Sequence, residues 1–141
     1  MKKIAIVYYS GTGNTALMAD AIKEGVEGAG SSAKKISAGL FGPDMLDSYD
    51  AFAFGCPASG AETLEEDVFE PMFTSLLPHL SGKRVALFGS YGWGDGEWMR
   101  NWEAEVRASG AILAGESLIA EDTPDEAALQ AAHLLGRALS E

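Results

Sequence analysis

Apolar runs of strand length alternate along this chain with longer segments whose apolar residues recur at helical spacing. The run at 4–9 is apolar on both faces, which is typical of a central parallel strand covered by helices. Further strands are expected at 51–55, at 85–89 and, without interruption, at 112–120, and a shorter run with lysines at 33–37 has the composition of an edge strand. This alternation predicts a doubly wound α/β fold with five strands, whose ligand lies at the carboxyl ends of those strands.

The helices between these strands are predicted from one-sided apolar patterns. Apolar residues within 18–29 share one helical face, and those at 68–77 form a second stripe that Pro78 ends. Trp98 and Trp102 are four residues apart on a third stripe, which is the spacing of a buried helix face. We therefore expect both indoles to pack in the core.

The last helix has the clearest start signal in the sequence. Thr123 is a candidate N-cap, Pro124 suits the first helical position, and Glu126 completes a capping box with Thr123. We therefore expect this helix to begin directly after Thr123.

Composition limits the location and the partners of the chain. Its 141 residues carry a net charge of −11, from 21 acidic and 10 basic residues. Nucleic acids and anionic membranes attract basic surfaces, so neither is an expected partner. No stretch has the pattern of a leader peptide or a membrane span, and the single cysteine, Cys56, cannot form an intramolecular disulfide or a metal site by itself. We expect one cytoplasmic, monomeric domain over residues 1–141, with Cys56 as a small buried residue.

Acidic residues concentrate in two segments of the chain. They are Glu62, Glu65, Glu66, Asp67 and Glu70 in one segment, and Asp95 and Glu97 in the other. Such runs are typical of a solvated helix face, but they also create a negative potential beside any group bound at the same edge. The sequence pattern alone leaves both interpretations open.

The loop Ser10–Thr15 joins the first strand to the N-terminus of the first helix. Its backbone N–H groups and the helix dipole converge there, which favours an anion. The loop contains no Lys or Arg, but the hydroxyls of Ser10, Thr12 and Thr15 and the amide of Asn14 add neutral hydrogen-bonding groups. This combination predicts a phosphate monoester held without cations.

Other phosphate loops fit the residues less well. A nucleoside-triphosphate loop needs a Gly-Lys-Ser/Thr ending, which is absent. Gly11, Gly13 and Ala16 formally satisfy a dinucleotide fingerprint, but no acidic residue follows the second strand near Ser37 to bind a ribose. A phosphatase of this topology needs Cys and Arg in the loop, and a phosphoaccepting receiver domain needs carboxylates where Tyr9 and Gly55 end their strands.

The motifs at all three loops of this edge resemble those of the flavodoxins. Ser-Gly-Thr-Gly-Asn-Thr at 10–15 is similar to the flavodoxin phosphate loop, the segment 55–62 to the second loop, and the segment 86–96 to the third. The similarity runs from Lys3 to about Leu139 in matching order, and the uninterrupted fifth strand, which lacks the long insertion found elsewhere in the family, is similar to that of short-chain, clostridial-type members. The resemblance implies a five-stranded parallel sheet in the order 2-1-3-4-5, with helices on both faces.

The resemblance also implies a non-covalently bound FMN. Loop 10–15 then holds the phosphate, Trp93 stacks on the outer flavin face, Glu62 accepts a hydrogen bond from the ring N3–H, and N–H groups at 89–93 face the pyrimidine oxygen. Trp93 lies among glycines and outside the predicted amphipathic helices, so core packing is not expected for it. The residues implied around FMN are Ser10, Gly11, Thr12, Gly13, Asn14, Thr15, Pro57, Ala58, Ser59, Gly60, Glu62, Gly89, Ser90, Tyr91, Gly92, Trp93 and Gly94.

The second loop departs from the family pattern at three positions. Ser59 stands where a bulky apolar side chain often covers the inner flavin face, and Pro57 stands where some members offer a hydroxyl to the phosphate. Ala61 follows Gly60 at a peptide that turns toward the flavin N5 on reduction, and alanine disfavours the positive φ of the turned state by roughly 1 kcal/mol. We therefore expect weaker stabilisation of the one-electron-reduced flavin than with Gly at position 61.

The expected function is that of a low-potential, one-electron carrier between redox proteins. The flavin supplies the chemistry, and the acidic segments would lower its potential and attract basic reductases and electron acceptors. No catalytic base or nucleophile stands beside the site, and Trp93 would block a substrate above the ring. An FMN-dependent quinone or nitro reductase, and a binding module without flavin, are the alternatives.

Overall fold

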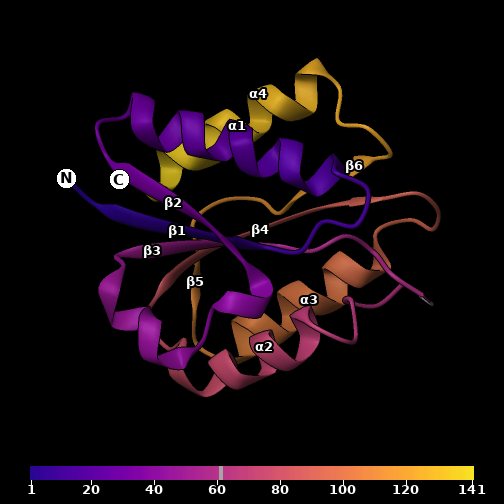
Figure 1. The fold of residues 1–141 in the computed structure, drawn as a ribbon, viewed down its shortest axis with the longest axis horizontal. Coiled ribbons are helices and arrows are strands. Elements are labelled where there is room, and N and C mark those ends of the chain that lie inside the picture. The colour runs from indigo at the N-terminus through magenta and orange to yellow at the C-terminus, as the bar shows by residue number, and fades with distance from the viewer. Residues whose placement is uncertain (61) are drawn as a thin grey trace.

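The computed structural model describes residues 1–60 and 62–141. A parallel sheet forms the middle layer, α1 and α4 cover one face, and α2 and α3 cover the other (Figure 1). The strands are β1 (Lys3–Tyr8), β2 (Ser32–Ser37), β3 (Ala51–Gly55), β4 (Arg84–Tyr91), β5 (Ile112–Leu113) and β6 (Leu118–Glu121). The helices are α1 (Asn14–Gly28), α2 (Phe69–Leu76), α3 (Glu97–Ala108) and α4 (Glu126–Leu139), and short 3₁₀ helices span Ala38–Leu40, Pro43–Ser48 and Leu77–His79.

The strand order confirms the expected topology. The sheet runs β2-β1-β3-β4-β5, and every pair in it is parallel. In the central pairs Ile4 lies opposite Ala51, and Ala53 lies opposite Ala86. β2 pairs only with β1, as its lysines predicted for an edge strand.

The fifth strand is not continuous, contrary to the expectation for 112–120. β5 and β6 both pair with β4, but the two residues Ala86 and Leu87 of β4 lie opposite the four residues 114–117. The extra residues form a bulge, and they include a glycine and two polar residues, which are poor strand formers. The fifth position of the sheet is therefore occupied by two short segments.

Two hydrophobic cores lie on opposite faces of the sheet. The core under α2 and α3 is aromatic and contains Trp98 and Trp102, each 2% exposed, which confirms the core packing expected for both indoles. The core under α1 and α4 consists mostly of aliphatic side chains, with Phe88 as its buried aromatic residue. Gly25 and Gly136 allow α1 and α4 to pack closely, because a Cβ would lie 1.9 Å from the His133 carbonyl oxygen at Gly25 and 2.2 Å from the Ile22 carbonyl oxygen at Gly136.

Two helix starts differ from the expectation. Asp125, rather than Thr123, is the N-cap of α4, and its carboxylate accepts a hydrogen bond of 2.8 Å from the Ala128 N–H. Asp is at least as good an N-cap as Thr, and the Asp125 carboxylate binds the N–H three residues on, so the helix begins after Asp125. Val68, expected on the apolar stripe, precedes α2 and is 38% exposed. None of the helices described is long and apolar enough to span a membrane.

Candidate functional site

Three loops meet beyond the carboxyl ends of β1, β3 and β4. Backbone hydrogen bonds hold them together past the strands: the Cys56 N–H donates to the Phe88 carbonyl and the Ala58 N–H to the Ser90 carbonyl, both at 3.0 Å. The third loop begins later than expected, because the strand expected at 85–89 continues as β4 to Tyr91. Ser90 and Tyr91 therefore lie within the strand rather than in the loop.

The first loop ends in the N-terminus of α1 and keeps unused donors there. Gly13 is the N-cap in a left-handed conformation, with φ +95°. The Ser10 hydroxyl oxygen accepts from the Gly13 and Ala16 N–H groups at 3.2 Å each. The N–H groups of Gly11, Thr12 and Thr15 have no acceptor among the residues described. The first turn also contains no acidic residue, so these donors have no negative side chain of their own there.

Two of the hydroxyls expected to bind a ligand also organise the loop. The Thr15 and Ser90 hydroxyl oxygens lie 3.0 Å apart, and both side chains are buried. This contact joins the N-terminus of α1 to the end of β4. Ser10 accepts two backbone hydrogen bonds, but its O–H proton can still be donated. Thr12 and Asn14 are more accessible, and Thr12 is exposed.

Gly89 and Cys56 bring the second and third loops into direct contact. A Cβ on Gly89 would lie 2.1 Å from the Cys56 carbonyl oxygen, so only glycine allows this approach. Cys56 is fully buried, as expected, and burial raises the pKa of its thiol to about 12. The thiolate needed for nucleophilic chemistry is therefore scarce at neutral pH, and the side chain acts as a small packing group.

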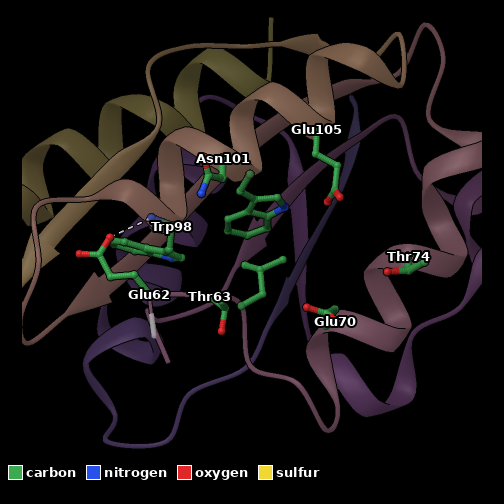
Figure 2. A pocket seen from close by; sticks show the side chains of 9 residues that line it. Glu62, Thr63, Glu70, Thr74, Trp98, Asn101 and Glu105 are labelled. Carbon is green, nitrogen blue, oxygen red and sulfur yellow. Dashed lines mark hydrogen bonds between the residues drawn. The ribbon is translucent and has the colours of Figure 1, made fainter. Parts of the chain in front are cut away.

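Glu62 fastens the second loop to the start of α3 (Figure 2). Glu62 is 8% exposed, and its carboxylate accepts hydrogen bonds from the Asp95 N–H at 2.8 Å and the Trp98 N–H at 3.2 Å. Gly94 makes room for it, because a Cβ there would lie 1.4 Å from Glu62 Oε1. Glu62 itself has a φ of +56°, which is rare outside glycine. This contact spans more than thirty positions of sequence, and no local pattern predicts it.

Glu65 is a structural residue that the sequence did not single out. Its carboxylate accepts from the Asp67, Val68 and Phe69 N–H groups at 2.8, 2.7 and 2.8 Å. Burial alone would raise its pKa, but these three donors outweigh burial and lower it. One sequence signal for this role was available: a Glu stands shortly before a helix that otherwise has no side-chain cap. The acidic run is thus divided: Glu62 and Glu65 are buried and bonded, whereas Glu66, Asp67 and Glu70 are exposed.

The remaining expected residues lie in the second and third loops. Trp93 is 55% exposed in the turn after β4, away from both cores. Ser59 forms a short antiparallel bridge with Thr63, with N–H to carbonyl distances of 2.8 and 2.9 Å. Gly60 has a φ of +54°. Ala61, on which the expectation about the turning peptide depends, lies outside the described residues.

Gly92 and Tyr91 complete the edge of the third loop. Tyr91 packs against Trp98, with ring centroids 5.4 Å apart, and its carbonyl accepts from the Asp122 N–H at 2.7 Å. Gly92 is exposed beside Asp122, while Pro57 and Ala58 are half-buried at the end of β3. No group of three or more His, Cys, Asp or Glu side chains in the described part of the chain could hold a metal ion.

Several known proteins are similar to this chain in sequence and fold. The family model for flavodoxins matches residues 6–134. The flavodoxin of Megasphaera elsdenii is 46% identical over 88% of this chain and 90% of its own length, and that of Clostridium beijerinckii is 45% identical over 86% and 88%. This chain belongs to the flavodoxin family. The solution structure of the two-electron reduced M. elsdenii flavodoxin superposes with a TM-score of 0.89, at 44% identity, over 97% of this chain and 98% of the other.

Membership confirms what the motifs implied about activity. The protein is a short-chain flavodoxin-type carrier that uses FMN to transfer electrons to redox partners, and it is not a substrate-transforming enzyme. The residues present suit the phosphate end of such a cofactor. Within the described part of the chain, three N–H groups at or just before the start of α1 have no acceptor, and the first turn of α1 contains no acidic residue. When bound, FMN supplies the redox chemistry, while the protein supplies affinity, environment and surface.

Proposed function

We propose that FMN binds to this flavodoxin through loop 10–15, with its ring between the second and third loops. The N–H groups of Gly11, Thr12 and Thr15 carry the proposal, because they have no acceptor among the described residues and lie at a helix N-terminus that contains neither an acid nor a base. Ser10, Gly13 and Asn14 complete the phosphate site. A site built only from neutral donors suits a terminal phosphate whose charge the helix dipole stabilises.

The ring would lie against Trp93, which is the exposed indole at this edge. An aromatic side chain outside the core is suited to stacking on a planar ring and to excluding water from one of its faces. The shaping residues are Pro57, Ala58, Ser59, Gly60, Gly89, Ser90, Tyr91, Gly92 and Gly94. Glu62 keeps lone pairs beyond its two backbone bonds, so it can also accept from a ring N–H.

The acidic surface around this edge would set both the potential and the partners. Glu66, Asp67, Asp95 and Glu97 are exposed close in sequence to the second and third loops. Their negative charge opposes the addition of an electron to the cofactor, which favours a low potential, and it attracts basic proteins in a salt-dependent way. We place this activity in the cytoplasm, with residues 1–141 acting as one monomeric domain.

Flavin titration of the apoprotein tests the phosphate assignment. We expect quenching of flavin fluorescence with FMN and binding of riboflavin weaker by about a thousandfold, because riboflavin lacks the phosphate that the helix N-terminus binds. Equal affinity for FMN and riboflavin would remove the phosphate site. A colourless purified protein that also fails to bind added FMN would favour a module without flavin.

A further inference from the structure

The indole of Trp98 supplies a hydrogen bond at the base of the second loop, where the backbone pairing of β3 with β4 is interrupted. The Cys56 N–H donates to the Phe88 carbonyl, so the next bond of this parallel pair would join the Cys56 carbonyl to the Ser90 N–H. Among the residues described that bond is absent, and the Ser90 N–H donates to the Thr15 hydroxyl oxygen at 3.4 Å. The Trp98 Nε1–H donates to the Cys56 carbonyl at 3.2 Å instead. A side chain of α3 thus replaces a backbone contact between two strands.

Trp98 holds the second loop at a second point as well. Its backbone N–H donates to the Glu62 carboxylate at 3.2 Å (Figure 2). The two acceptors, the Cys56 carbonyl and the Glu62 carboxylate, belong to the two ends of the segment 56–62, which includes Ser59 and Gly60. Both ends of this segment are therefore bonded to a single residue of α3.

The same indole packs against the end of β4, from which the third loop departs. A Cβ on Gly89 would lie 3.3 Å from the Trp98 Cζ2 atom, and the Tyr91 ring lies 5.4 Å from the Trp98 ring between centroids. Trp98 is only 2% exposed, so water does not compete for its indole N–H. One buried side chain thus contacts both of the segments between which the flavin ring is proposed to lie.

We propose that Trp98 is a positioning residue, whose indole N–H holds the second loop in the shape that receives the flavin ring. This inference rests on the proposed function, because it concerns the ring end of the same site. Pro57 follows Cys56 and has no N–H of its own, so the start of the loop has few backbone bonds that could replace this one. A buried carbonyl without a donor is unfavourable, and without the indole N–H the loop would shift to expose the Cys56 carbonyl.

The substitution Trp98→Phe tests this role, and Trp102→Phe is its matched control. Trp102 is the other buried indole of α3, and it lines a groove of about 320 Å³ between α2 and α3 (Figure 2). Its Nε1–H has no acceptor among the residues described. Both substitutions remove the same atoms from the same helix, but only Trp98→Phe removes a hydrogen bond to the second loop.

Amide hydrogen exchange in the apoprotein is the first measurement. The Ala58 N–H, which donates to the Ser90 carbonyl at 3.0 Å, reports opening of the second loop. Its exchange should become about tenfold faster in Trp98→Phe, relative to the amide of Val7 in β1, which reports opening of the whole domain. In Trp102→Phe the same ratio should stay within about twofold of the natural protein.

Flavin binding and potential are the second measurement. FMN and riboflavin should both bind about tenfold more weakly to Trp98→Phe, because the substitution disturbs the ring end of the site and leaves the phosphate end intact. The midpoint potential of bound FMN should become less negative, since a loosened loop admits water, which stabilises the added charge of the reduced cofactor. Trp102→Phe should change both affinities by less than about twofold and leave the potential unchanged.

Equal effects of the two substitutions on exchange, affinity and potential would overturn the proposal, and so would a loss of affinity for FMN alone. If Trp98→Phe does not fold, benzothienylalanine incorporated at position 98 keeps the double ring and replaces only the N–H with sulfur. Unchanged exchange at Ala58 in that variant would also overturn the proposal. If the natural protein binds no flavin but exchange at Ala58 changes as expected, the proposed function fails, while the fastening of the second loop by Trp98 is upheld.

Discussion

The four main helices begin at the same edge of the sheet, yet α1 begins differently from the others. A backbone N–H at the start of α2 donates to the Glu65 carboxylate. In the same way, an N–H at the start of α3 donates to Glu62, and one at the start of α4 donates to Asp125. α1 has no acidic residue in its first turn, although the chain carries 21 acids. A helix N-terminus stabilises negative charge, and three of these four receive it from the protein itself. We propose that the fourth, at α1, receives its negative charge from the bound cofactor.

A carboxylate introduced into loop 10–15 should have the largest effect, because it would give the start of α1 a negative charge like that of the other three helices. Thr12→Asp would bring the loop its own negative charge beside the phosphate site. At ~5 Å and an effective dielectric of ~20, each phosphate charge would be disfavoured by on the order of 3 kcal/mol. We expect FMN affinity, measured by fluorescence titration, to fall by about a hundredfold or more.

Thr12→Asn is the matched control, because it keeps the size of the Asp side chain without its charge. Its FMN affinity should stay within about tenfold of the natural protein, since an amide can still donate to phosphate. Riboflavin affinity should be the same in both variants. If the Asp and Asn variants bind FMN alike, loop 10–15 does not hold the phosphate.

Removal of the carboxylate above α2 should have the next largest effect. Glu65→Ala leaves the Asp67, Val68 and Phe69 N–H groups without their acceptor. We expect the free energy of unfolding in urea to fall by about 2–3 kcal/mol. Glu66→Ala removes an exposed acid from the same segment and should cost less than about 0.5 kcal/mol. A comparable loss in both variants would show that general charge in this segment matters rather than the cap.

The same carboxylate should make stability depend on pH in a defined direction. Burial raises and three backbone donors lower the pKa of Glu65, with a net decrease in the folded state. Its contribution is therefore fully present above the unfolded pKa of ~4.3 and is lost as the pH falls through the lower folded value. The difference in unfolding free energy between the natural protein and Glu65→Gln should be constant near neutrality and shrink in acid. A difference that grows in acid would contradict this assignment.

Glu62 offers a smaller test at the start of α3. Glu62→Gln leaves one carbonyl oxygen for two N–H donors, those of Asp95 and Trp98. We expect unfolding free energy to fall by about 1–2 kcal/mol. Glu66→Gln changes charge equally and should be nearly neutral. A neutral Glu62→Gln would mean that the carboxylate does not fasten the second loop to α3.

The sequence predicts most of the fold because the signals for strands and helices are local. Buried strands such as 51–55 and the aromatic stripe of α3 can be recognised from a few neighbouring residues. The phosphate loop is also local, since its strand, glycines, hydroxyls and helix are contiguous. The bulge at 114–117 is different, because its apolar flanks hide a change of register that only pairing with β4 defines.

The role of Glu62 within the site is likewise hard to predict from local sequence. Glu62 looks like any member of an acidic run until α3 is brought against it, and a contact across the fold leaves no local spacing to read. The groove between α2 and α3 is likewise made by residues from two helices and a loop. Ligand-binding motifs are thus predictable where one segment supplies them, and poorly predictable where segments must first pack.

At the start of α4, two neighbouring residues compete for the same N-cap position. Thr123 and Asp125 can both act as N-cap, and the observed cap is Asp125, whose carboxylate binds the Ala128 N–H at 2.8 Å. Asp125→Ala should lower the free energy of unfolding by about 1 kcal/mol, whereas Thr123→Ala should change it by less than about 0.5 kcal/mol. Urea unfolding of the two variants decides between the caps, and the opposite order of effects would restore the capping box at Thr123. Neither substitution should alter FMN affinity by more than about twofold, because the α4 cap faces its own helix and leaves the donors at the start of α1 unchanged.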